Sequence, residues 1–235
     1  MTAATARRLL GEYLGSAGLA AAVIGSGIAA ASLSPTDVGL QLLQNSYATA
    51  LALAVLIAVF AGISGAHFNP VVTLAERVLA PQDRSASEAA LYIAAQIAGC
   101  LSGAVVANLM FDLGPATWST TERATAPHLL AEVVATAGLI GTIFLLVRAR
   151  RTAWIAPAVG AYIGAAYYFT SSTSFANPAI TVGRMITDTF AGIAPSSVLP
   201  FIGAQLVGAA LGALAVRLLV PASAVPATGN AVEGT

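Results

Sequence analysis

A five-residue phrase occurs twice in this chain of 235 residues, and it limits the available folds more than any other feature. It reads Asn-Pro-Val-Val-Thr at 69–73 and Asn-Pro-Ala-Ile-Thr at 177–181, and each copy follows a long apolar run and a loop rich in small residues. Proline is well tolerated at the first position of a helix, and asparagine is a good N-cap before it. Two copies therefore predict two broken helices that begin inside an apolar layer.

The apolar runs are long enough to cross a membrane. The chain is 57% hydrophobic and only 9% charged, with a mean hydropathy of +0.83, and these values are typical of a membrane protein rather than a soluble domain. A hydrocarbon core of about 30 Å takes about 20 apolar residues of helix. Six stretches are predicted to span it, the fifth being the shortest: 8–32, 42–64, 87–111, 128–149, 153–171 and 198–220.

The two halves of the chain repeat more than the Asn-Pro phrase. The segment around Glu12 matches the segment around Glu132, and the pattern Ala-Gln-x-x-Gly occurs at both 95–99 and 204–208. Three spans in each half make the second half enter the membrane from the opposite side, so the repeats are predicted to be inverted.

The expected fold is an all-α membrane protein with six transmembrane helices and two re-entrant half-helices in inverted repeats. The tail is predicted to be disordered, because it is rich in Pro, Gly, Ala and Ser and lacks apolar periodicity. The first repeat is expected at 1–113 with its half-helix at 69–79, and the second repeat at 128–220 with its half-helix at 177–187. A connecting loop at 114–127 joins the repeats, and the tail is 221–235.

Basic residues are concentrated on one side of the predicted membrane. All ten are arginine, and ten acidic residues balance them. Only Arg123 and Arg184 fall on the side away from the termini, whereas eight fall on the other side: Arg7, Arg8, Arg77, Arg84, Arg148, Arg150, Arg151 and Arg217. Because cytoplasmic loops carry an excess of positive charge, we expect a multi-pass protein of the cytoplasmic (inner) membrane with both termini in the cytoplasm.

The two predicted half-helices would meet N-terminus to N-terminus near the midplane. The positive ends of their dipoles would face each other beside the amides of Asn69 and Asn177. Such a centre repels cations and offers N–H donors to a neutral solute that carries hydroxyl groups. The alternative is that each Asn-Pro pair only caps a buried helix, although irregular backbone at this depth requires burial or a water-lined path.

The chain resembles the major intrinsic protein family, the aquaporins and aquaglyceroporins, over its full length except the tail. The resemblance is carried by the segment from Gly65 to Thr73, by the triplet that begins at Asn177, and by the paired Glu12 and Glu132. It implies an aquaporin-like homotetramer with a pore in each protomer, in which six residues form the pore motifs: Asn69, Pro70, Val71, Asn177, Pro178 and Ala179.

The resemblance also implies roles for three residues at membrane depth. In the family, the histidine equivalent to His67 lines the cytoplasmic half of the pore, and the alternative is a packed histidine. Intramembrane carboxylates are costly unless they bind something. In the family, those equivalent to Glu12 and Glu132 brace the re-entrant loops through backbone amides, and a proton relay is the alternative.

The chain departs from the family at the outer constriction. The family usually has arginine three residues after the second motif asparagine, and this chain has isoleucine there. Arg184 lies one helical turn further along and is expected in the outer vestibule unless its side chain folds back. Projecting the family's constriction onto the chain gives four positions: Thr49, Ser174, Ile180 and either Tyr167 or Ala165. The constriction is therefore expected to be wide and uncharged.

These features predict a passive channel for small uncharged solutes: glycerol-like polyols, arsenous acid or other neutral metalloid hydroxides, and water. The segments 170–177 and 188–195 look like those of a bacterial aquaglyceroporin branch associated with arsenic resistance. A water-selective pore, an ion-leaky pore and a non-conducting membrane protein of the same fold stay open as alternatives. No nucleophile–base arrangement, phosphate loop or metal-ligand spacing predicts an enzyme, a cofactor or a metal site, and the balanced charge gives no indication of nucleic-acid binding.

Overall fold

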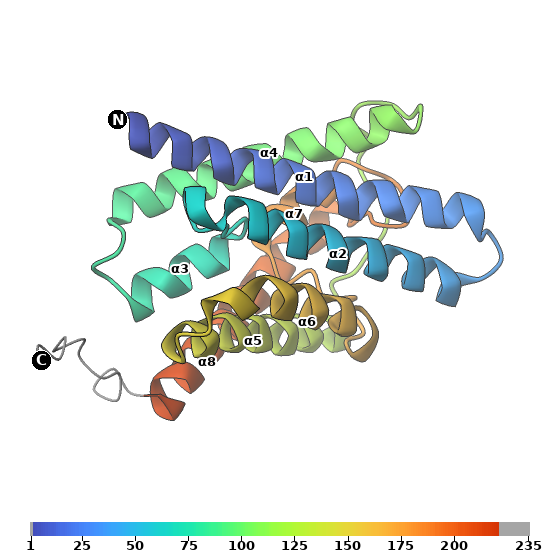
Figure 1. The fold of residues 1–235 in the computed structure, drawn as a ribbon. Coiled ribbons are helices and arrows are strands. Elements are labelled where there is room, and N and C mark those ends of the chain that lie inside the picture. The colour runs from blue at the N-terminus through green and yellow to red at the C-terminus, as the bar shows by residue number, and fades with distance from the viewer. Residues whose placement is uncertain (1, 221–235) are drawn as a thin grey trace, which may run out of the picture.

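The computed structural model describes residues 2–220, which are all-helical with no strand among them (Figure 1). The predicted disordered tail at 221–235 lies outside the described residues. The helices are α1 (Ala3–Leu33), α2 (Val38–Ser64), α3 (Pro70–Leu79), α4 (Ala86–Met110), α5 (Ala126–Arg148), the 3-10 turn η1 (Thr152–Trp154), α6 (Ile155–Phe169), α7 (Pro178–Arg184) and α8 (Pro195–Leu219).

The predicted all-α membrane fold is confirmed, but the fifth predicted span is shorter than expected. Within residues 2–220, five helices (α1, α2, α4, α5 and α8) are long and apolar enough to cross a membrane. The stretch predicted at 153–171 contains α6, whose 15 residues extend only about 22 Å at 1.5 Å per residue. It ends at Phe169 because Thr170 has an extended backbone conformation (φ −115°, ψ 135°), from which the chain turns into the re-entrant loop.

The connection between the two halves lies slightly earlier in the chain than the predicted loop at 114–127, because α4 already ends at Met110. Helix α5 already begins at Ala126, and the Thr125 side chain caps it. Pro127 therefore lies in the first helical turn, where the missing backbone N–H breaks no helical hydrogen bond.

The half-helices begin where the sequence predicts. The Asn69 side chain accepts the Val71 N–H at 3.1 Å, and the Asn177 side chain accepts the Ala179 N–H at 2.9 Å. The predicted end of the second half-helix at 187 is wrong, since α7 ends at Arg184. Beyond that residue the carbonyl groups of 185 and 186 accept N–H groups from 119 and 117 of the connecting loop, which replaces further helical bonding.

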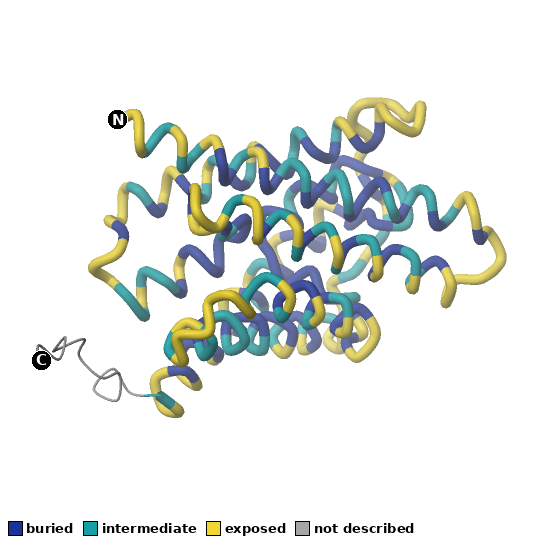
Figure 2. The backbone as a smooth tube through the Cα atoms, viewed as in Figure 1, coloured by how far each residue is buried: buried dark blue, intermediate teal, exposed yellow. Residues whose placement is uncertain are grey.

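Glycines allow the long helices to cross closely. Figure 2 shows buried residues concentrated where the helices cross in the middle of the molecule. On α4, Gly99 and Gly103 leave no room for a Cβ atom beside the α1 backbone, and on α8, Gly208 and Gly212 pack in the same way against α5. Such small-residue contacts drive helix association in lipid, where apolar burial gives little advantage.

We expect Gly103→Ala to lower the free energy of unfolding by about 1–3 kcal/mol, the usual effect of overpacking. The new methyl group would overlap the Ala17 carbonyl oxygen on α1. Gly203→Ala on α8 is the matched control, because nothing lies within 4 Å of its added Cβ atom. Unfolding midpoints in detergent would measure both, and equal shifts for the two variants would contradict this packing.

The outward faces of the helices are apolar. On α2, Leu51, Val55 and Val59 are 52%, 61% and 59% exposed, and their spacing of four residues places them on one face. An exposed apolar stripe on a membrane-length helix is the expected surface toward lipid or a neighbouring protomer.

Candidate functional site

The two Asn-Pro loops bind each other at the centre of the molecule. The Asn69 amide donates to the Ala176 carbonyl, and the Asn177 amide donates to the Phe68 carbonyl, both at 2.8 Å. Each amide has two N–H donors, so one donor on each asparagine is not needed for this contact. Both asparagines line the cavity described below, where the second donor can meet a solute.

Both loops contain residues in the left-handed backbone region. Ala66 and Phe68 have φ of 53° and 51°, and Ser174 and Ala176 have φ of 51° and 45°. This conformation costs about 1–2 kcal/mol per non-glycine residue, and it persists only where the surroundings enforce it. The same alternation in both loops turns their backbone N–H groups toward buried carboxylates.

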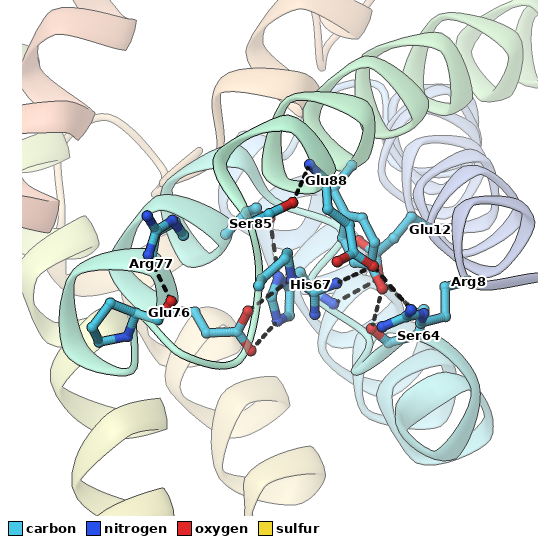
Figure 3. Close-up of polar contacts among 12 residues, drawn as sticks. Arg8, Glu12, Ser64, His67, Glu76, Arg77, Ser85 and Glu88 are labelled. Carbon is cyan, nitrogen blue, oxygen red and sulfur yellow. Dashed lines mark hydrogen bonds and ion pairs between the residues drawn. The ribbon is translucent and has the colours of Figure 1, made fainter. Parts of the chain in front are cut away.

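The first carboxylate is Glu12 on α1, which is fully buried. It accepts the backbone N–H groups of His67 (3.1 Å) and Phe68 (2.8 Å). It also accepts the Ser64 hydroxyl at 2.6 Å and the Gln96 amide at 2.7 Å. Figure 3 shows Glu12 and Ser64 beside the His67 segment. Four donors on one carboxylate fix the loop to α1, α2 and α4.

Glu132 on α5 repeats this arrangement in the second half. It accepts the backbone N–H groups of Phe175 (2.9 Å) and Ala176 (2.8 Å). The Ser172 hydroxyl and the Gln205 amide donate to it at 2.6 and 2.7 Å. The glutamines also donate to the threonines that end the two phrases, Gln96 to Thr73 and Gln205 to Thr181.

Sequence reasoning missed the serines, glutamines and threonines of these two networks. The signal was available, because Ala-Gln-x-x-Gly and the final threonine of the Asn-Pro phrase both occur once in each half. Repetition alone does not say which side chains meet, however. A glutamine on an apolar helix is equally compatible with several buried partners.

A cavity of about 190 Å³ lies between the two loops and the surrounding helices. It is large enough for several water molecules, since one needs only about 10–15 Å³ of such volume. Its wall is mainly apolar, including Leu53, Ile57 and Val159, and its polar groups come chiefly from the loops and half-helices. Such a lining gives a solute few but well-placed hydrogen-bond partners.

The four predicted constriction residues all line this cavity: Thr49, Tyr167, Ser174 and Ile180. The Tyr167 hydroxyl donates to the Thr49 hydroxyl at 3.2 Å, so α6 and α2 meet there. Of the two alternatives on the fifth predicted span, Tyr167 faces the cavity and Ala165 is exposed.

Arg184, which is expected in the outer vestibule, lies in the wall of the cavity. It is only 3% exposed and lines the same cavity as Ile180. Its guanidinium lies 3.4 Å from the centre of the Phe175 ring, and its Nε donates to the Ala191 carbonyl. The Phe175 ring and the Ala191 carbonyl together hold the side chain in place at the cavity wall.

His67 also lines the cavity, and it lies beside a group of charged side chains (Figure 3). Its Nδ1 lies 3.0 Å from the Thr73 hydroxyl and its Nε2 lies 3.2 Å from Glu76 Oε1. Arg84 bonds the other Glu76 oxygen at 2.9 Å and lies 3.8 Å above the Tyr92 ring. Burial alone would lower the pKa of Arg84, but the bond to Glu76 outweighs it and raises that pKa.

Comparison with known proteins agrees with this architecture. Residues 1–167 match the family model described as Major intrinsic protein. Aquaglyceroporin AqpS of Rhizobium meliloti (strain 1021) is 44% identical over 220 residues, which cover 92% of this chain and 91% of AqpS. Aquaporin A of Dictyostelium discoideum is 31% identical over 208 residues, covering 83% and 72% of the two chains.

A solved structure has the same fold. The X-ray structure of the aquaglyceroporin from Plasmodium falciparum superposes with a TM-score of 0.68, covering 92% of this chain and 98% of that one at 16% identity. Identity this low supports the fold alone. The family match and the bacterial relative go further, and this chain belongs to the major intrinsic protein family.

Proposed function

We propose that this protein is a passive transmembrane channel for small uncharged solutes. The observation that carries the proposal is the cavity that both Asn-Pro loops line, with amide and hydroxyl groups set into an apolar wall. The first relative described above is named an aquaglyceroporin, which supports glycerol-like polyols as one solute class. A channel family also gives no reason to propose catalysis.

In this proposal Asn69 and Asn177 donate hydrogen bonds to the passing solute. Glu12 and Glu132 hold the two loops in their strained conformation, and His67 lines the cytoplasmic half of the path. The halves enter the membrane from opposite sides, so the positive ends of α3 and α7 meet at the midplane and oppose cations. This reading is supported by the reciprocal asparagine contacts.

The proposed selectivity is that of a wide, uncharged constriction formed by Thr49, Tyr167, Ser174 and Ile180. Three hydroxyl groups and one aliphatic side chain in the lining suit a molecule with several hydroxyls. Glycerol and arsenous acid both meet that description. The similarity of segments 170–177 and 188–195 to the arsenic-associated branch supports the second, and metalloid transport belongs to the proposal only.

The proposed assembly is a homotetramer in the cytoplasmic membrane with both termini in the cytoplasm. The arginine distribution supports that orientation. The apolar stripe on α2 supports contacts with lipid or with a neighbouring protomer.

Proteoliposomes that contain the purified full chain are expected to pass glycerol, arsenite at neutral pH and water faster than empty liposomes. Stopped-flow light scattering measures glycerol and water, and elemental analysis of the vesicles measures arsenic. One observation favours a water-selective pore, namely the burial of Arg184 beside the constriction. Water flux without glycerol or arsenite flux would establish that reading and reject the wide constriction.

A further inference from the structure

Glu76 and Arg184 occupy equivalent places in the two Asn-Pro phrases. Each follows its motif asparagine by seven residues, and each lies one helical turn beyond Val72 or Ile180. Both line the cavity, from opposite half-helices. The two repeats therefore place opposite charges at matching positions of the same path.

The two charges differ in how the protein satisfies them. Glu76 accepts from Arg84 at 2.9 Å and has His67 at 3.2 Å, so both of its oxygens have a basic partner. Arg184 has no carboxylate within ion-pair distance anywhere in the described chain. A buried charge without a partner of opposite sign is strongly unfavourable.

The protein uses only a small part of the hydrogen-bonding capacity of Arg184. A guanidinium has five N–H donors in a planar fork, and within residues 2–220 one of them, on Nε, is bonded, to the Ala191 carbonyl. The Phe175 ring covers one face of the group. Because Arg184 lines the cavity, the remaining donors can bond only to what the cavity holds.

Two neighbours favour an anion at this end of the cavity. The Arg123 guanidinium lies 5.3 Å from the centre of the same Phe175 ring and bonds carbonyl groups of residues 190 and 192. It adds positive charge and has no carboxylate within ion-pair distance among residues 2–220, although Glu132 is near enough to offset part of the charge of both guanidinium groups. The Ser174 hydroxyl is buried and lines the cavity, yet it has no hydrogen-bond partner in the described structure. Ser174 directly precedes Phe175, whose ring contacts Arg184, so we expect one acceptor oxygen in this part of the cavity to meet both groups.

We propose that Arg184 and Ser174 form a binding site for a small oxyanion at the Phe175 end of the cavity. The planar fork of a guanidinium suits two oxygens of a sulfate, phosphate or carboxylate, and Arg123 attracts the anion toward it. An anion held there occupies the path of neutral solutes and slows their flux. The inhibition rests on the proposed channel function, whereas anion binding itself does not.

The test measures glycerol flux into proteoliposomes in sulfate and in chloride, at matched osmolarity and ionic strength. We expect sulfate to slow wild-type flux saturably, and Arg184→Gln to weaken the apparent sulfate affinity by about tenfold, as loss of a charge-assisted bidentate contact would. Ser174→Ala is expected to weaken it less. Arg7→Gln is the control, because it makes the same kind of change at an exposed position of α1. Sulfate should inhibit glycerol flux through this variant as strongly as through the wild type.

Equal sulfate inhibition of the wild type and Arg184→Gln, or no inhibition of a wild type that passes glycerol, would overturn the site. Binding is also measured without transport, as the sulfate-dependent rise of the unfolding midpoint in detergent. If the wild type passes no glycerol in chloride, the proposed channel function is wrong. The anion site would still be supported if sulfate raised the unfolding midpoint of the wild type but not that of Arg184→Gln. If Arg184→Gln does not fold, Arg184→Lys and Ser174→Ala are compared with the wild type instead. An unchanged sulfate affinity in both of these variants would reject the anion site.

Discussion

Replacing Ile180 with arginine is expected to lower glycerol flux by about tenfold or more, equivalent to at least 1.4 kcal/mol at the barrier. Ile180 is 4% exposed and lines the cavity beside the other constriction residues. A longer, charged side chain there would fill part of the path. It would also stand one turn from Arg184, where like charges repel, and it would add a second positive charge to the cavity wall.

The flux assay separates size from other effects. Ile180→Val removes one methyl group and should keep glycerol and arsenite flux near the wild-type level. In Ile180→Arg, water flux should fall less than glycerol flux, because a water molecule needs a narrower opening. Unchanged glycerol and arsenite flux in a folded Ile180→Arg protein would show that residue 180 does not set the width of the path.

The local features of this fold could be predicted because they depend on few residues. A proline after an asparagine specifies both the start of a half-helix and its N-cap, and α3 and α7 begin there. Long apolar runs specify helices, and α2, α4 and α5 lie within a few residues of their predicted bounds. The equivalence of Glu12 and Glu132 in the two repeats could be predicted because the same short sequence pattern surrounds both.

The parts that could not be predicted depend on contacts between distant segments. Helix α7 ends at Arg184 because the connecting loop bonds the residues after it, and nothing in the local sequence marks that partner. The buried position of the Arg184 side chain depends on contacts with Phe175 and Ala191, which lie in the loops before and after α7. Helix α6 is short because the chain leaves it at Phe169 to form the second re-entrant loop. The composition of α6 is that of an ordinary membrane span and does not indicate this early end.

Removing the Glu132 carboxylate is expected to cause the largest loss of stability of any single change considered for this chain. Glu132→Ala leaves the N–H groups of Phe175 and Ala176 and the Ser172 hydroxyl without an acceptor. The Gln205 amide loses one of its two acceptors and keeps Thr181. Each buried donor left unpaired costs about 1–3 kcal/mol. The second loop would then relax from its left-handed conformation, and glycerol flux should be lost together with a large fall in the unfolding midpoint.

Glu132→Gln distinguishes loop support from proton relay. The amide keeps the size and one acceptor oxygen, but its NH₂ group meets donors instead of accepting from them, so we expect an intermediate fall in the unfolding midpoint. Glu122→Gln is the matched control, because Glu122 is itself exposed, although it likewise accepts hydroxyl groups, from the exposed Ser196 and the buried Ser197. A Glu132→Gln protein with wild-type stability and altered proton flux would favour the relay. If Glu132→Gln loses stability while Glu122→Gln does not, the role of Glu132 is to hold the second re-entrant loop, which carries Asn177.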